Sequence, residues 1–153
     1  MNSTKYNQAI EAQEKLTKAF ALIRKRGVVA RQRFKCCGSC AGYAIGVEVA
    51  AKVTADAGFK YKFKGCCFYS KQGGFFDRND VGSCYLKFGQ VDTQEHGPVG
   101  LSTVEVGKII CECLAEAGLA FEWDGTEDKC IEVKITPPEP PTAFQRVLHD
   151  DTL

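Results

Sequence analysis

Residues 28–40 read Val28-Val29-Ala30-Arg31-Gln32-Arg33-Phe34-Lys35-Cys36-Cys37-Gly38-Ser39-Cys40. Their first half predicts a strand over 28–34, with odd-numbered side chains on one face and even-numbered ones on the other. Their second half opens a predicted helix over 39–57, which Gly58 ends. The cysteine motif therefore lies where a strand passes into the N-terminus of a helix.

The sequence on either side of this unit predicts further helices and strands. Apolar residues at helical spacing, stop residues and a Ser102–Glu105 capping box mark the helices, and alternation and the Asp124-Gly125 turn mark the strands. The predicted elements are a helix over 5–26, strands over 60–69 and 84–88, a helix over 103–117, and a hairpin of 119–123 with 130–135.

The predicted order is α–β–α–β–β–α–β–β, which indicates an α+β fold. We expect a two-layer sandwich in which an antiparallel sheet of about five strands carries the helices on one face. The central β–α–β–β–α–β run has the split βαβ arrangement of ferredoxin-like folds, with an added N-terminal helix and C-terminal hairpin. Another α+β sandwich of the same elements is the alternative. Residues 1–136 form one predicted domain, and 137–153 form a Pro-rich spacer and tail.

Composition excludes several classes of protein. The chain has 153 residues, 44% of them hydrophobic and 25% charged, as expected for one globular domain. Its formal net charge of +1 gives no overall attraction to nucleic acid or to anionic membranes. No apolar stretch approaches the roughly 20 residues of a membrane span, and the N-terminus lacks signal-peptide features. We therefore expect a cytoplasmic protein.

Nine cysteines need an explanation. Their odd number, two adjacent pairs and the missing export signal argue against a disulfide framework, so most should be free thiols. In the predicted topology six of them converge on one edge of the sheet. These candidate metal ligands are Cys36, Cys37, Cys40, Cys66, Cys67 and Cys84.

Three interpretations of these thiols stay open. Cys37 and Cys40 have the C-x-x-C spacing that lets two thiolates bind one zinc ion, with other cysteines completing a tetrahedron. Alternatively, Cys37 attacks and Cys40 resolves in thiol redox chemistry, because a helix N-terminus stabilises a thiolate. The third interpretation is that the thiols merely pack as small hydrophobic side chains.

The remaining sequence motifs give weaker evidence of function than the cysteines do. No catalytic set stands at a recognisable spacing, which argues against an enzyme. A predicted sheet face carries basic residues with interleaved aromatic ones, a pattern that can bind single-stranded nucleic acid, although Glu122 and Glu132 share this face. A solvated or helix-covered face is the simpler interpretation. The basic residues are Arg31, Arg33, Lys60, Lys62, Lys64 and Lys87.

Three stretches resemble one uncharacterised bacterial family known only as a domain of unknown function. They are residues 26–40 with the double-cysteine motif, 85–89, and 117–125 with Trp123-Asp124-Gly125. The resemblance covers about residues 10–135 and implies a bacterial or phage origin without an activity. Similar members carry an aromatic-His-x-Gln-Asp run where this chain has residues 68–72, directly after Cys66 and Cys67.

The sequence therefore favours a small binding or regulatory module whose partner is another protein and whose cysteine-rich end can hold zinc. The alternative is a thiol oxidoreductase or redox sensor that uses Cys37 and Cys40.

Overall fold

The computed structural model describes residues 3–76 and 81–135. It confirms the predicted α+β class, with a five-stranded sheet in the order β1-β2-β3-β7-β6 and a separate two-stranded sheet of β4 and β5. The predicted spacer and tail over 137–153 lie outside the described residues.

Most of the predicted elements are present, with small shifts at their ends. The helices are α1 (Ser3–Lys25), α2 (Gly38–Ala55), α3 (Phe59–Lys62) and α4 (Thr103–Glu116). The strands are β1 (Val28–Arg31), β2 (Gly65–Phe68), β3 (Cys84–Gly89), β4 (Val91–Thr93), β5 (Gly97–Val99), β6 (Phe121–Glu122) and β7 (Ile131–Val133).

The main sheet is mixed, so the predicted antiparallel sheet is wrong at one end. β1 runs parallel to β2, and the other neighbouring strands pair antiparallel. The ferredoxin-like arrangement is not observed either, because it would insert another strand between β1 and β2. The reason is that α2 serves as the crossover that parallel neighbours require and returns the chain directly beside β1.

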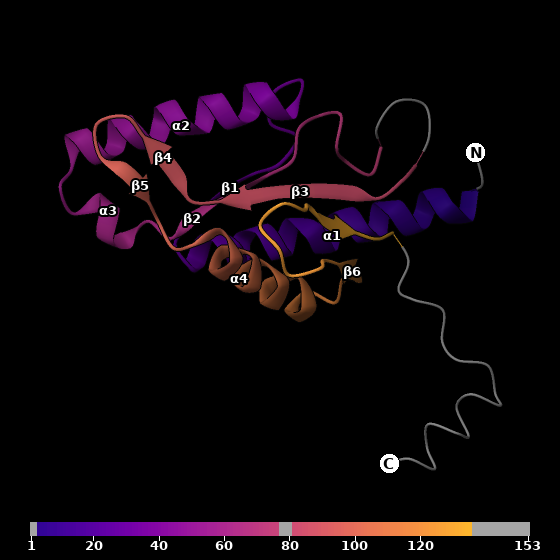
Figure 1. Ribbon diagram of the computed structural model, residues 1–153. Helices are drawn as coiled ribbons and strands as arrows, with labels where there is room; N and C mark the ends of the chain where they lie inside the picture. The colour runs from indigo at the N-terminus through magenta and orange to yellow at the C-terminus, as the bar shows by residue number, and fades with distance from the viewer. Residues whose placement is uncertain (1–2, 77–80, 136–153) are drawn as a thin grey trace, which may run out of the picture.

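The helices lie on both faces of the sheet, which corrects the expectation of one covered face. Figure 1 shows α2 on one side and α1 with α4 on the other. Each side has its own core: Cys67 packs among residues of α1 and α4, whereas Cys66 and Phe68 pack against α2. All residues of β2 are consequently buried, as is typical of a strand covered on both faces.

The predicted strand over 60–69 divides into two elements. Phe59–Lys62 forms a single helical turn, closed by the Phe63 N–H donating to the Phe59 carbonyl at 2.9 Å, and only Gly65–Phe68 is strand. Tyr61, which lies in this turn, is 74% exposed. The alternating lysines reflect an exposed turn rather than one face of a sheet.

The C-terminal half agrees better with its local sequence signals. The Ser102 hydroxyl accepts from the Glu105 N–H at 3.3 Å and caps α4, as predicted. The predicted hairpin is present as β6 and β7. The β4–β5 hairpin was not predicted, and the Thr93 hydroxyl stabilises it by donating to the Gly97 carbonyl at 3.0 Å.

No helix among residues 3–76 and 81–135 is both long enough and apolar enough to cross a lipid bilayer.

Candidate metal centre

Three cysteines meet on the surface where β1 gives way to α2. The sulfur atoms of Cys36, Cys37 and Cys40 all lie within 4.8 Å of one another. Cys36 and Cys40 are exposed and Cys37 is half-buried. Within the described parts of the chain, no other group of three or more Cys, His, Asp or Glu side chains is placed to hold a metal ion. We refer to these three residues as the thiol cluster.

The backbone that leads into the thiol cluster adopts an unusual conformation. Arg33 and Lys35 both have left-handed backbone angles, with φ values of 48° and 63°. Such a conformation costs a non-glycine residue roughly 1–2 kcal/mol. Two hydrogen bonds to the segment after β2 offset this cost, from the Phe34 N–H to the Tyr69 carbonyl at 2.9 Å and from the Lys71 N–H to the Lys35 carbonyl at 3.0 Å. These two bonds therefore hold the backbone that leads to Cys36 and Cys37 against the segment after β2.

The N-terminus of α2 separates the acidities of two of the thiols. Cys37 is the N-cap residue, and its pKa is lowered mainly by the backbone N–H of Cys40 and then by the Cys40 and Cys36 side chains. Hydrogen bonding to Cys37 and Cys36 raises the pKa of Cys40 to about 11. Cys37 therefore loses its proton more readily than Cys40.

The spacing of the sulfur atoms fits tetrahedral coordination. Two thiolates that each lie about 2.3 Å from zinc, at the tetrahedral angle, are about 3.8 Å apart. The Cys36 and Cys40 sulfur atoms are 3.8 Å apart. The widest separation in the cluster, 4.8 Å at most, needs only a small inward movement of exposed side chains. The cluster can thus supply three ligands to one thiophilic ion and leaves the fourth position open to solvent.

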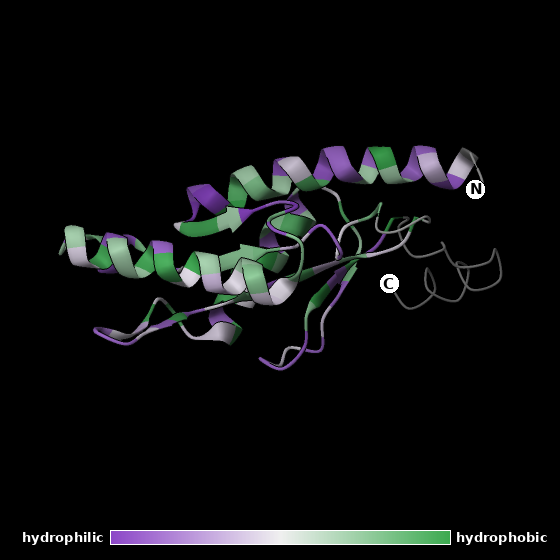
Figure 2. Ribbon diagram, turned by 90° about the horizontal axis from the view of Figure 1, so that it is seen from above, coloured by the Kyte–Doolittle hydropathy of each residue, from purple (hydrophilic) through white to green (hydrophobic). Residues whose placement is uncertain are grey.

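The surface around the cluster combines a cation with apolar side chains. The Lys87 ammonium from β3 packs against Gly38, where an added Cβ would overlap with it. Along α2, Cys40 is followed by Tyr43 and Val47, which lie on the same side of the helix and are 77% and 53% exposed. Figure 2, viewed from above, shows apolar colour along much of α2. This stripe was not predicted from the sequence.

The other three candidate ligands lie apart from the cluster. Cys66 and Cys67 are buried in β2 and Cys84 is buried in β3. Burial raises the pKa of each of these thiols, to about 11 for Cys66. Cys66 and Cys67 even face different cores of the molecule. Of the six candidate thiols, the structure brings three together.

The basic residues that were expected to share a sheet face are distributed over several elements. Lys60 and Lys62 belong to α3, and Lys87 belongs to β3. Arg31 of β1 points to the side covered by α2 and donates to Glu48 at 2.6 Å. Arg33 lies in the left-handed connection before the cluster, and Lys64 lies between α3 and β2.

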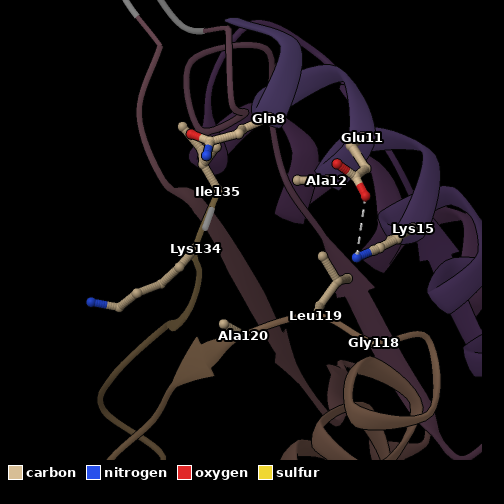
Figure 3. Close-up of a pocket in the computed structure, with 9 residues that line it drawn as sticks. All are labelled: Gln8, Glu11, Ala12, Lys15, Gly118, Leu119, Ala120, Lys134 and Ile135. Atoms are coloured by element: carbon tan, nitrogen blue, oxygen red, sulfur yellow. Dashed lines mark ion pairs between the residues drawn. The ribbon is translucent and has the colours of Figure 1, made fainter. Parts of the chain in front are cut away.

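A separate pocket opens between α1 and the connections around β6 and β7 (Figure 3). Its volume is about 250 Å³, and Leu119 and Ala12 form part of its wall. Glu11 and Lys15 form an ion pair at its rim, with 3.8 Å between their charged atoms. Lys134, which also lines the pocket, is paired with Glu122 at 3.3 Å, so each charged side chain of this pocket already has a partner.

Fold and cluster together define a small α+β domain that carries three surface thiols able to bind a metal ion. The chain belongs to the family described as Domain of unknown function (DUF6891), whose model matches residues 2–136. This confirms the predicted membership of an uncharacterised family. No curated protein and no solved structure matches the chain.

Proposed function

We propose that this protein is a metal-dependent binding module in which Cys36, Cys37 and Cys40 hold one zinc ion. The observation that carries the proposal is the mutual approach of three thiol sulfurs to within 4.8 Å on one surface. Thiolates are soft ligands that favour zinc over harder cations such as magnesium or calcium. The lowered pKa of Cys37 supports the proposal, because a thiol must lose its proton to bind a metal ion.

The zinc has a binding role in this proposal rather than a structural one. A structural zinc usually has four protein ligands and supplies much of the folding free energy. Here only three ligands are available in the cluster, and the two cores are built from apolar side chains elsewhere. The open fourth position would take a Cys or His side chain of a partner protein. The exposed Tyr43 and Val47 beside it provide apolar contact area for that partner.

Metal binding by the purified protein tests this function. Cobalt is a useful probe, because its absorption in the visible region is intense only when several thiolates surround it in a tetrahedral site. We expect one cobalt ion per chain, displaced by one equivalent of zinc. Adding a small free thiol should change the spectrum as it enters the fourth position.

Two variants make the test specific. Cys37→Ser removes a ligand from the cluster and should weaken zinc binding by at least tenfold. Cys130→Ser removes an exposed cysteine outside the cluster and should leave binding unchanged. Equal effects of both variants, or binding of less than one ion per ten chains, would contradict the proposal.

A second function, thiol–disulfide exchange, is favoured by the opposite pKa shifts of Cys37 and Cys40. The Cys37 thiolate would attack a sulfur of a substrate disulfide, forming a mixed disulfide and releasing one thiolate. Cys40, after losing its proton to solvent, would then attack the Cys37 sulfur and release the second thiolate. The substrate disulfide is reduced, and Cys37 and Cys40 are oxidised to a disulfide.

The two functions differ in how the oxidised protein behaves. For the redox function, treatment with a small disulfide such as oxidised glutathione should yield a Cys37–Cys40 disulfide that is detected by peptide mapping. Cys40→Ser should stop the reaction at the mixed disulfide on Cys37. If zinc prevents this oxidation at one equivalent, the cluster serves primarily as a metal site.

A further inference from the structure

A second pocket lies beside β1, at the edge of the sheet. Its walls come from the end of α1, from β1, from α2 and from α3, and its volume is about 330 Å³. This is within the size range of pockets that bind small molecules, roughly 300–1,000 Å³. None of its lining residues belongs to the thiol cluster, so any function here is separate from metal binding.

All charged side chains that line this pocket are cationic. They are Arg24, Arg31, Lys52 and Lys62. This concentration stands out because the whole chain has a formal net charge of only +1. We call this site the cationic pocket.

Among the residues that the structure describes, one carboxylate forms ion pairs with these cationic groups. Glu48 of α2 accepts from Arg31 at 2.6 Å and lies 3.2 Å from the Lys52 ammonium, but it does not line the pocket. Arg24 donates to the Ala30 carbonyl at 3.2 Å, which orients its guanidinium and keeps its charge. The Lys62 side chain forms no ion pair with the residues that the structure describes. The cationic pocket therefore keeps an excess of positive charge that an anion could neutralise.

The remaining wall of the pocket is aromatic and aliphatic. Phe59 and Phe63 stack with ring centroids 5.6 Å apart and an interplanar angle of 26°. The Lys52 ammonium lies 5.8 Å from the centre of the Phe59 ring. Phe63 is buried and anchors the pair, whereas Phe59 is only partly buried. The wall can thus contact an apolar or ring-shaped part of a ligand next to the cationic groups.

Arginine and lysine together suit a phosphate group. Guanidinium groups offer paired N–H donors that match phosphate oxygens, and lysine adds a mobile point charge. We propose that the cationic pocket binds a small organic phosphate, with its phosphate against the cationic groups and its organic part against the Phe59–Phe63 wall. A pocket of this size accommodates one such molecule rather than a length of nucleic acid.

Calorimetric titration with adenosine monophosphate, adenosine and inorganic phosphate tests the proposal. Adenosine monophosphate should bind more tightly than either fragment, and its affinity should fall at high salt because screening weakens charge contacts. Equal binding of adenosine would overturn the role of the phosphate, and equal binding of inorganic phosphate would overturn the role of the aromatic wall. A single-stranded oligonucleotide that binds more tightly than the mononucleotide would overturn the small-molecule assignment.

Charge-removing variants locate the site. Lys62→Gln should weaken binding of adenosine monophosphate about tenfold, the usual effect of losing one hydrogen bond to a charged group. Lys60→Gln is the matched control, because Lys60 lies on the same helical turn but does not line the pocket. Equal weakening by both variants, or no weakening by Lys62→Gln, would show that binding occurs elsewhere. Zinc should not alter the affinity, since the thiol cluster shares no residue with the cationic pocket.

Discussion

The structure assigns different roles to cysteines that look alike in the sequence, and Cys67 gives the sharpest test. Its side chain is 0% exposed and packs in the core between the sheet and α1 with α4. Cys67→Ser replaces a weakly polar sulfur by a hydroxyl in an apolar environment. A buried hydroxyl without a hydrogen-bond partner costs about 1–3 kcal/mol. We expect the free energy of unfolding to fall by that amount.

The comparison with alanine makes this prediction specific. Cys67→Ala also removes the sulfur, but it introduces no polar group, so it should destabilise the protein less than Cys67→Ser. Cys40→Ser changes an exposed residue and should alter the free energy of unfolding by less than about 0.5 kcal/mol.

Urea unfolding, followed by the fluorescence of the single tryptophan, measures these differences. With a slope of about 2 kcal/mol per molar urea, Cys67→Ser should lower the midpoint by roughly 0.5–1.5 M. The reasoning is refuted if Cys67→Ala is more destabilising than Cys67→Ser, because the lost packing of the sulfur would then outweigh the cost of burying a hydroxyl. It is equally refuted if Cys40→Ser lowers the midpoint as much as Cys67→Ser does.

Three other predictions concern pH and packing. Burial raises the pKa of the Cys66 thiol from 9.0 to about 11, so this thiol ionises at lower pH in the unfolded chain than in the folded one. The free energy of unfolding should therefore fall as the pH rises between those values, by about 1.4 kcal/mol per pH unit for each such group. Urea titrations across that pH range measure this decrease. The lowered pKa of Cys37 and the raised pKa of Cys40 predict that iodoacetamide labels Cys37 before Cys40 below pH 9, as peptide mapping would record. Preferential labelling of Cys40 would contradict this order. Gly107→Ala should destabilise the fold by about 1–3 kcal/mol despite the higher helix propensity of alanine, because the new Cβ would lie 2.5 Å from the Trp123 ring. Thermal unfolding measures this change. An unchanged midpoint would mean that the ring moves aside without cost.

Local signals in the sequence predicted the three long helices, and three short stretches predicted the family. The capping box at Ser102 and the Asp124-Gly125 turn each depend on residues close in the chain, so both features are present where they were expected. The strand over 60–69 was mispredicted because alternation does not distinguish a strand from an exposed helical turn next to a short strand. The resemblance to an uncharacterised family was confirmed over residues 2–136.

The candidate site was predictable only in part. Cys37 and Cys40 are three residues apart at the start of a helix, and such spacing brings sulfur atoms together whatever the rest of the fold does. Whether Cys66, Cys67 and Cys84 could join them depended on the depth at which β2 and β3 are buried. The cationic pocket was missed for a similar reason, because its charged residues are far apart in the chain and meet only through packing.

The sequence alone determined the α+β class, the main helices and the closeness of the Cys37 and Cys40 thiols. These features follow from periodicity and short-range spacing. Only the tertiary structure decided that helices cover both faces of the sheet, because the α2 crossover sets β1 beside β2 and leaves α2 opposite α1 and α4. That arrangement buries Cys66 and Cys67 in separate cores and leaves the thiol cluster at the surface. The physical reason is that burial depends on which faces of a strand are covered, and this is a property of the packed chain as a whole.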